Sequence, residues 1–312
     1  MINGIPKISV MIITYNQQGV ISRAIDSLLS QQDFIYEICV SDDCSTDGTW
    51  SILQDYSDRY PGLFKLNRNA SNIMMFENTE KVWTMPKGDL VCGLAGDDGC
   101  GEGWFKTVLD FIDKNGIDYK NEDLCIYGDY KAVYLNGDSY IHKNDLVLSG
   151  LNPLKLGIRG LLGNRGAVFS VSLLHKFQKV SQGRSYIAEA AQDRQLQVFS
   201  EKNYYIPWIG NIYYSGIGVS SNMTGERKRT NLLRWDYLLS CLKMWGVELD
   251  SKDKSYVEYR KAKERGAVFN AFQHYLHSID CSLQMRGLKL RRVLFAVLRR
   301  LPHNRPISNY IV

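Results

Sequence analysis

The chain has 312 residues, 45% of them hydrophobic and 23% charged, and a net charge of +5 at neutral pH. This composition is typical of a globular protein and excludes a disordered or collagen-like chain. No apolar run reaches the roughly 18 residues that a membrane-spanning helix needs, and the first residues lack the layout of a signal peptide. We therefore expect a cytoplasmic protein.

Seven cysteines are scattered at wide, irregular spacing, without a C-x-x-C pair. An odd number at such spacing argues against a disulfide framework and against a structural zinc site. Several of them stand inside apolar runs. The pattern therefore predicts reduced thiols, which agrees with a cytoplasmic location.

Strands and helices alternate along the first hundred residues. Residues 8–15 form an unbroken β-branched and apolar run, typical of a strand buried on both faces of a parallel sheet. Apolar residues then recur at helical spacing over residues 20–29. Further strands are predicted at residues 36–41, 63–66 and 90–95. This order predicts an α/β fold with a mainly parallel sheet flanked by helices.

Polar residues follow four of these strands at the point where each strand ends: Thr14, Tyr15 and Asn16; Asp42 and Asp43; Asn69 and Asn72; Asp97 and Asp98. In open α/β sheets, ligands bind beyond the carboxyl ends of the strands. Two adjacent carboxylates there are costly without a positive partner. A hard divalent cation, which usually also carries substrate phosphates, is the natural partner.

The first strand–helix turn has no glycine-rich phosphate motif. Residues 16–20 read Asn-Gln-Gln-Gly-Val, which matches neither the dinucleotide fingerprint nor the P-loop. This argues against a dinucleotide-dependent dehydrogenase and against a P-loop enzyme. A carboxylate-bound cation would then hold the phosphates, in place of a glycine-rich nest.

The pattern changes after residue 103. Shorter, tyrosine-rich strands are expected at residues 124–127 and 131–135, with Asn136 and Gly137 as a hairpin turn. Another strand is expected at residues 165–171, and a helix over about 187–199. This half should be mixed or antiparallel, and the glycine- and serine-rich residues 216–222 are the best candidate boundary.

The last third of the chain is helical in pattern and basic. In residues 288–300, apolar side chains share one helix face and basic side chains take the other. Such a helix can lie on an anionic membrane surface, or dock on the protein's own core with its basic face in water. A nucleic-acid-binding protein is a further interpretation, but the interleaved aromatic and basic pattern of a binding sheet is missing. We therefore expect no nucleic-acid partner.

Four stretches, in this order, resemble the family 2 glycosyltransferases, which have the GT-A fold. They are Ser-Val-Met-Ile-Ile-Thr-Tyr-Asn at 9–16, Ser-Asp-Asp-Cys-Ser-Thr-Asp-Gly-Thr at 41–49, Lys-Gly-Asp at 87–89 leading to Gly-Asp-Asp at 96–98, and Gln-Asp at 192–193. The resemblance covers about residues 6–220. It implies a GT-A domain at 1–220, with a nucleotide-sugar half at about 1–100 and an acceptor half at 101–220. Residues 221–312 would form a helical C-terminal region.

The resemblance implies a nucleotide-diphospho-sugar donor, most often a UDP-sugar. Thr14, Tyr15 and Asn16 would border the nucleotide, with Tyr15 against the base. Asp43 would accept a hydrogen bond from the base or the ribose, and a carboxylate suits the imino N–H of uracil. Asn72 would be a further contact to the donor.

The resemblance also assigns the chemistry. Asp98 would be the main ligand of Mn²⁺ or Mg²⁺, with Asp97 beside it near the ribose or the diphosphate. Asp193 would be the catalytic base that takes the proton of the incoming hydroxyl. Asn164 and Arg165 would lie near the acceptor. One base opposite the leaving group implies inversion at the anomeric carbon.

The implied function is metal-dependent sugar transfer to a glycan or lipid-linked acceptor in surface polysaccharide biosynthesis. The implied location is the cytoplasm, with peripheral association at the inner face of the cell membrane. Two positions depart from the family pattern: Ala95 stands where a third acid is frequent, and Gln192 where a glutamate often precedes the base. The missing acid leaves open a non-catalytic relative that only binds sugar nucleotides.

Overall fold

The computed structural model describes residues 4–150, 152–177, 194–216, 227–265 and 268–278. The chain divides into two compact units, Met1–Glu248 and Leu249–Val312. The catalytic base predicted at Asp193, the boundary near residue 220 and the basic helix at 288–300 all lie outside the described residues. The predicted division into domains therefore stays a prediction. No helix in the described ranges combines the length and the apolar character needed to cross a bilayer.

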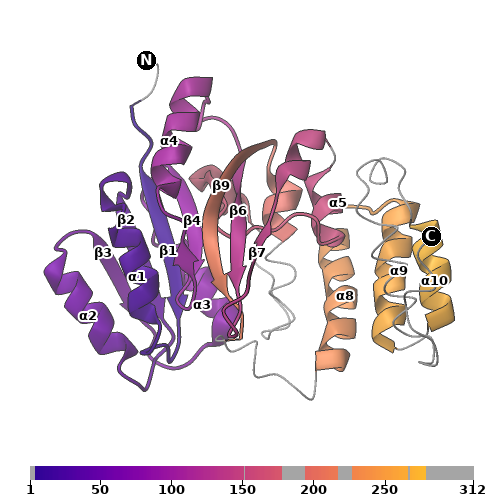
Figure 1. Cartoon of the computed structure of the whole chain (residues 1–312), viewed down its shortest axis with the longest axis horizontal. Coiled ribbons are helices and arrows are strands. Elements are labelled where there is room, and N and C mark those ends of the chain that lie inside the picture. The colour runs from indigo at the N-terminus through magenta and orange to yellow at the C-terminus, as the bar shows by residue number, and fades with distance from the viewer. Residues whose placement is uncertain (1–3, 151, 178–193, 217–226, 266–267, 279–312) are drawn as a thin grey trace. The chain divides into compact units, whose positions relative to one another are not determined.

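Four parallel strands form the first half of the sheet, in the order β3-β2-β1-β4. They are β1 (Ile8–Thr14), β2 (Glu37–Asp42), β3 (Phe64–Arg68) and β4 (Leu90–Ala95). Every residue of β2 is buried, and so is every residue of β1 except one, which is why apolar residues occupy the middle of both strands. Parallel pairing brings the four carboxyl ends to the same edge of the sheet (Figure 1).

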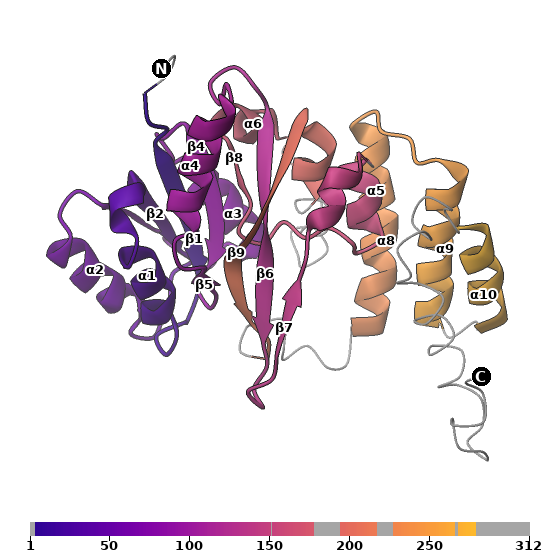
Figure 2. The same cartoon turned by 45° about the horizontal axis from the view of Figure 1, so that its top comes forward.

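Helices cover both faces of these strands. On one face lie α1 (Ile21–Leu29), α2 (Thr49–Arg59) and α4 (Trp104–Asn115) (Figures 1 and 2). Their apolar stripes meet the sheet, and a fully buried isoleucine or leucine there contributes about 1.5–3 kcal/mol. On the other face lies α3 (Met74–Trp83), whose Phe76 packs against Cys241 of α8 (Arg227–Met244).

The second half of the sheet is mixed, as the sequence predicts. Beyond β4 the order continues as β8 (Val168–Ser170), β6 (Leu124–Val133), β9 (Lys202–Tyr214) and β5 (Gly99–Cys100). Strand β8 is antiparallel to both neighbours, β6 and β9 are parallel, and β5 is antiparallel to β9. Strand β7 (Ser139–His142) pairs with β6 in a hairpin, and Asn136 and Gly137 lie in its turn.

Two expected strands differ in the structure. One continuous β6 replaces the two strands predicted at residues 124–127 and 131–135, and it bulges between Tyr127 and Tyr130. At this bulge a side chain on Gly128 would meet the Trp104 ring at 2.8 Å, so the close approach of β6 to α4 requires glycine. The strand predicted at 165–171 begins only at Val168, because a left-handed turn precedes it.

Short helices complete the first unit: 3₁₀ turns at Gln32–Phe34 and Asp145–Ser149, and helices α5 (Pro153–Ile158) and α6 (Val171–Lys176). Residues 194–199 are also helical. The second unit contains α9 (Ser251–Arg265) and α10 (Val268–His277), which confirms the predicted helical character of this region. The rings of Tyr259 and Tyr275 join these two helices at 5.1 Å.

The six cysteines among the described residues are all free thiols. Burial in the sheet raises the pKa of Cys39, Cys92 and Cys125 to about 12. At neutral pH these thiols stay protonated and act as small apolar core residues.

Candidate active site

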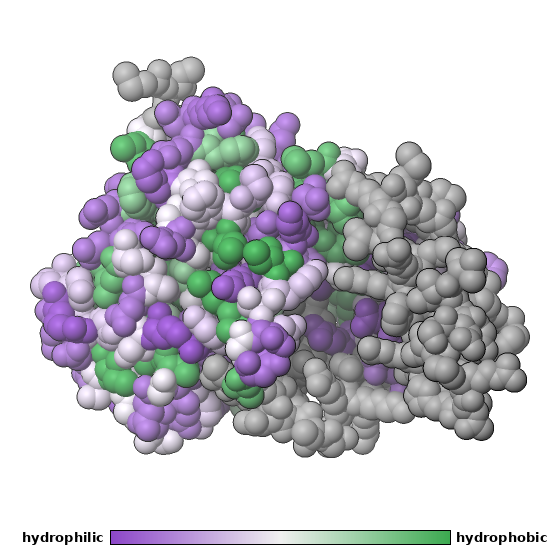
Figure 3. All heavy atoms as spheres, in the orientation of Figure 1, coloured by the Kyte–Doolittle hydropathy of each residue, from purple (hydrophilic) through white to green (hydrophobic). Residues whose placement is uncertain are grey.

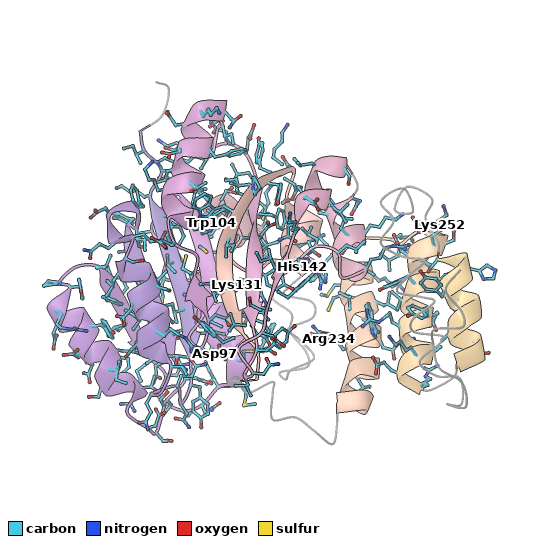
Figure 4. All side chains as sticks on the ribbon, in the orientation of Figure 1. Asp97, Trp104, Lys131, His142, Arg234 and Lys252 are labelled. Carbon is cyan, nitrogen blue, oxygen red and sulfur yellow. The ribbon has the colours of Figure 1, made fainter. Side chains whose placement is uncertain are left out.

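The polar strand ends meet at one edge of the sheet, as predicted. The amide of Asp43 donates to the carbonyl of Thr14 at 2.9 Å, and the amide of Gly96 donates to that of Ile13 at 3.1 Å. The amide of Asn69 donates to the carbonyl of Asp42 at 2.9 Å, which extends the same edge. Asp97 lies at this end of the strands in Figure 4. One continuous site can therefore form here.

The loop after β1 is tied to the loop after β2. Asn16 adopts a left-handed conformation with φ of +50°, which asparagine tolerates better than most residues. Its amide donates to Ser45 Oγ at 2.9 Å, and its Oδ1 accepts from the amide of Thr46 at 2.8 Å. Thr14 Oγ1 donates to Gln17 within its own loop. These predicted nucleotide residues thus use their side chains to shape the site, and the half-buried ring of Tyr15 lies between them in the chain.

Asp43 is buried but keeps one oxygen free. Its Oδ1 accepts from Asn69 Nδ2 at 3.0 Å and from the amide of Ile73 at 2.8 Å. Within the described part of the chain, Oδ2 has no hydrogen-bond partner and is not among the fully buried polar atoms. An acceptor fixed in this way can receive a hydrogen bond from a ligand.

A polar network behind Asp43 was not predicted from the sequence. Asn69 Nδ2 also donates to Asn78 Oδ1 at 2.9 Å, and Ser41 Oγ donates to the same oxygen at 2.6 Å. Asn78 is buried on α3, which the sequence shows only as a polar residue in an amphipathic helix. Asn72, in contrast, is exposed, and its Oδ1 accepts from the amide of Met74 at 2.9 Å in a turn that begins α3.

The other acids of the second motif hold the loop together. Asp42 is fully buried, accepts from the amide and hydroxyl of Ser45, and lies 3.5 Å from Arg68 Nε. Asp47 accepts from the amides of Gln18 and Thr49. Burial acts to raise the pKa of Asp47, but the hydrogen bonds from Thr49 and Gln18 outweigh it and hold that pKa below its usual value. Only Asp43 of these acids keeps an oxygen toward the site.

Asp98 lies at the turn after β4, where both halves of the sheet contribute to its surroundings. Its side chain is only 3% exposed, and its Oδ2 lies 3.0 Å from Arg165 Nη1 in an ion pair. Its Oδ1 accepts from the amide of Tyr214 at 3.4 Å, and the Asn211 side chain also donates to the carboxylate. Burial raises the pKa of Asp98 to about 6; Arg165 opposes this rise and the neighbouring Asp97 adds to it.

Two arginines flank the Asp97–Asp98 turn, each stacked on a tyrosine of β9. Arg23 of α1 donates to the carbonyl of Asp97 at 2.7 Å and lies 3.5 Å from the ring centre of Tyr214. Arg165 lies 3.9 Å from the ring centre of Tyr213. Sequence reasoning missed Arg23 and both tyrosines, because no local signal links β9 to a turn more than a hundred residues earlier.

The two residues predicted for the acceptor region separate in the structure. Arg165 joins Asp98, whereas Asn164 Oδ1 accepts from Gln197 Nε2 at 2.8 Å. Gln197 belongs to the helical residues 194–199, which directly follow the predicted base Asp193 in the chain.

Comparison with known proteins finds a family match in the first part of the chain. The family model for glycosyl transferase family 2 matches residues 9–120, which include every strand-end residue from Thr14 to Asp98. This part of the chain is similar to glycosyl transferase family 2. The match ends before β6, so it covers the first half of the sheet and none of the residues that reach Asp98 from the second half.

Three similar proteins cover different shares of this chain. An uncharacterized protein of Mycobacterium tuberculosis is 35% identical over 91 residues, 29% of this chain and 26% of that protein, so this chain spans about a quarter of its length. A GalNAc(5)-diNAcBac-PP-undecaprenol beta-1,3-glucosyltransferase of Campylobacter jejuni is 26% identical over 314 residues, 96% of this chain and 95% of that protein. A poly(ribitol-phosphate) beta-glucosyltransferase of Bacillus spizizenii is 25% identical over 64% of this chain and 32% of that protein.

Among solved structures, TarS of S. aureus has a similar fold. Its residues 1–349 in complex with UDP-GlcNAc match with a TM-score of 0.58 and 17% identity, over 84% of this chain and 73% of that chain. At this identity the likeness concerns the fold alone. It confirms the GT-A-like architecture that the sequence predicts.

The family commonly uses a divalent cation, and the residues present fit one only in part. Within the ranges that the structure describes, no group of three or more His, Cys, Asp or Glu side chains could hold a metal ion. Asp98 and Asp97 provide oxygen ligands at the strand end, and Ala95 provides none. Mg²⁺ and Mn²⁺ sites of nucleotide enzymes are often completed by substrate phosphates. The site therefore fits a cation held jointly by Asp98 and a diphosphate, and not a cage made of protein alone.

Proposed function

We propose that this protein is an inverting, metal-dependent glycosyltransferase that moves a sugar from a nucleotide-diphospho-sugar to a hydroxyl of a glycan or lipid-linked acceptor. The observation that carries the proposal is the buried Asp98 at the carboxyl edge of a family 2 sheet, with the free Oδ2 of Asp43 at the same edge. The names of two similar proteins, a glucosyltransferase that acts on an undecaprenol-linked glycan and one that acts on poly(ribitol-phosphate), support surface polysaccharide biosynthesis as the setting.

The donor is a UDP-sugar in this proposal. Asp43 Oδ2 would accept the imino N–H of uracil, because only an acceptor can pair with that group. Tyr15 would lie against the base, with Thr14 and Asn16 bordering the nucleotide and Asn72 beside it. The complex of TarS with UDP-GlcNAc supports this donor class through the shared fold.

The chemistry follows from the charges at the edge of the sheet. Breaking the bond to the anomeric carbon leaves negative charge on the departing diphosphate. Mn²⁺ or Mg²⁺ bound to Asp98 would supply Lewis-acid stabilisation of that charge. Asp97 would orient the ribose or the diphosphate. Asp193, from the opposite side, would take the proton of the attacking hydroxyl, which gives inversion.

The acceptor would bind on the second half of the sheet. Asn164 and Arg165 precede β8 there, and Tyr140 and Ile141 on β7 are 52% and 44% exposed. Apolar residues gather over the middle strands on the face seen in Figure 3. Tyrosine rings present an apolar face with a polar tip, which suits sugar rings. These features support a glycan-bearing acceptor.

The first experiment is a thermal-shift panel of UDP, GDP, CDP and ADP, each with Mn²⁺ and with chelator. A ligand that binds only the folded state raises the unfolding midpoint by mass action. We expect UDP with Mn²⁺ to give the largest shift. A larger shift with another diphosphate would keep the reaction and change the donor, and no shift with any nucleotide would contradict the proposal.

A transfer assay then distinguishes the enzyme from a non-catalytic relative that only binds sugar nucleotides. Ala95 favours the non-catalytic relative, because it leaves the site with one acid fewer. Asp193→Asn keeps the size of the side chain and removes the base, so turnover should fall about 10²–10⁴-fold while UDP binding stays. Turnover that survives this change would exclude Asp193 as the base. Absence of turnover in the wild type with any UDP-sugar would favour the binding relative.

We also propose that the protein works at the inner face of the cell membrane, through the basic residues 288–300. Liposome flotation with anionic lipid compares the full chain with a chain that ends at Asp280. The shorter chain should lose membrane binding, because about 1 kcal/mol per basic residue near an anionic surface goes with it. Equal flotation of the two chains would contradict this part of the proposal.

A further inference from the structure

An ion pair stands where the proposed function needs a cation. Arg165 Nη1 lies 3.0 Å from Asp98 Oδ2, and the Tyr214 amide and the Asn211 side chain donate to the same carboxylate. Both carboxylate oxygens are therefore engaged. A divalent cation at Oδ2 of Asp98 would compete with the guanidinium for the same oxygen, because two like charges in contact with one buried group repel each other.

The backbone of Arg165 is fixed, but its side chain has room to move. The next residue, Gly166, has φ of +68°, and its carbonyl accepts from Trp104 Nε1 at 2.9 Å. A side chain on Gly166 would meet the backbone of Gly210 at 2.6 Å, so this loop is pressed against β9. The Arg165 side chain itself is 42% exposed and stacks on the ring of Tyr213. It can leave Asp98 without any movement of the loop.

The guanidinium suits a diphosphate as well as it suits a carboxylate. Its planar fork of N–H donors matches the oxygens of either group in a two-bond geometry. A donor that brings a diphosphate and a divalent cation to Asp98 supplies both new partners at once: the cation for Asp98 and phosphate oxygens for Arg165. The exchange leaves no buried charge unpaired, which would otherwise be costly.

We propose that Arg165 is a stand-in cation: it neutralises Asp98 in the free protein and moves to the diphosphate of the donor when a divalent cation takes its place. The inference rests on the proposed nucleotide-diphosphate donor. It follows that the free protein binds the cation weakly and that nucleotide and cation bind with positive coupling. Arg165 then contributes to stabilisation of the leaving group, and not only to the acceptor region.

The test measures Mn²⁺ binding to the full chain from the loss of the free-ion electron paramagnetic resonance signal, with and without UDP. Arg165→Met removes the competing charge, so we expect Mn²⁺ without nucleotide to bind about tenfold more tightly than in the wild type, and UDP in the presence of Mn²⁺ to bind about tenfold more weakly. Unchanged Mn²⁺ binding in Arg165→Met without nucleotide would overturn the inference.

Arg68→Met is a matched control. Arg68 also pairs with a buried aspartate of the strand edge, Asp42, and its side chain is equally exposed, at 42%. It does not contact Asp98, so this variant should bind Mn²⁺ without nucleotide as the wild type does. A change of the same size in Arg68→Met would mean that loss of any edge arginine loosens the site, and would overturn the specific role.

Arg165→Lys keeps the inference testable if the methionine variant does not fold. Lysine retains the charge and loses the fork, so Mn²⁺ without nucleotide should stay weakly bound while UDP affinity falls. UDP affinity equal to that of the wild type would contradict the proposed contact to the diphosphate. Failure of the wild type to bind any nucleoside diphosphate would instead reject the proposed function, so the two failures remain distinct.

Discussion

The two halves of the sheet build their parts of the site in different ways. In the half of β1 to β4, the loops that follow neighbouring strands hold each other's polar groups. Asn16 is hydrogen-bonded to Ser45, and Asp43 is hydrogen-bonded to Asn69. In the half of β5 to β9, Asp98 meets Arg165 across 67 residues and Tyr214 across 116 residues. The donor side is thus shaped by contacts between consecutive strand–helix loops, 29 and 26 residues apart, whereas the surroundings of Asp98 are assembled from segments much farther apart in the chain.

The largest expected effect comes from the residue that joins the halves. Asp98→Ala removes the proposed cation ligand and leaves Arg165 without its partner, so transfer should fall about 10²–10³-fold or more. The measurement is kcat/KM for sugar transfer at saturating Mn²⁺. The carboxylate of Asp89, at the opposite end of β4, accepts from the Lys7 amide. Asp89→Ala should therefore leave kcat/KM within a few-fold. An equal loss of kcat/KM in both variants would contradict a specific role of the Asp98 carboxylate.

A second change attacks the packing between the halves. Gly101 follows β5, and a side chain there would lie 1.6 Å from the carbonyl oxygen of Ile209 on β9. Gly101→Ala should lower the free energy of unfolding by about 2–3 kcal/mol, because the two backbones must separate. Gly93→Ala in β4 has open space around it and is the control in chemical denaturation. Wild-type stability in Gly101→Ala would show that this contact can relax.

A third change sharpens the donor side without disturbing its shape. In Asp43→Asn the remaining carbonyl oxygen can still accept from Asn69 and Ile73, so the unfolding midpoint should not move. The new NH₂ group would face the imino N–H of uracil, so two donors would meet. UDP affinity should fall about tenfold, because one good hydrogen bond to a charged group is lost. Calorimetric titration measures it, with Asp55→Asn on the exposed side of α2 as the charge control. Unchanged UDP affinity would remove Asp43 from base recognition.

The smallest effect concerns an anchor of the second half. Asp123 precedes β6 and accepts from Ser172 Oγ at 2.7 Å and from Lys176 of α6. Burial acts to raise the pKa of Asp123, but the hydrogen bonds from Lys176 and Ser172 outweigh it and hold the pKa below its usual value. The contribution to stability is therefore present above about pH 4 and is lost as the pH falls through the lowered pKa.

Asp123→Asn should cost about 1 kcal/mol at pH 7, a modest figure because Lys176 is half exposed and screened by water. Denaturation at pH 7 and at pH 3 measures the difference. The gap between wild type and variant should narrow at the lower pH. A constant gap would mean that the charge of Asp123 is not what stabilises α6.

The same contrast explains what the sequence could predict. The strands β1 to β4, their parallel arrangement and their polar ends follow from apolar runs and turn residues that are adjacent in the chain. The pairing of the two-residue β5 with β9, the joining of two predicted strands into β6 and the contact of Arg165 with Asp98 depend on register between distant segments, which no local pattern encodes. Asn78 was missed because a buried asparagine in a helix looks like any surface residue. Asp193 stays a prediction, since it lies outside the described residues.

The register of β9 decides which arginine each of its two consecutive tyrosines contacts. Tyr213 and Tyr214 are consecutive, so their rings point to opposite faces of the strand. One ring carries Arg23 from a helix, and the other carries Arg165 from a loop. An insertion or deletion of one residue before Tyr213 in β9 would exchange the two faces and take each ring away from its arginine. The number of residues in this strand therefore matters for the surroundings of Asp98, and variants or designs should keep it unchanged.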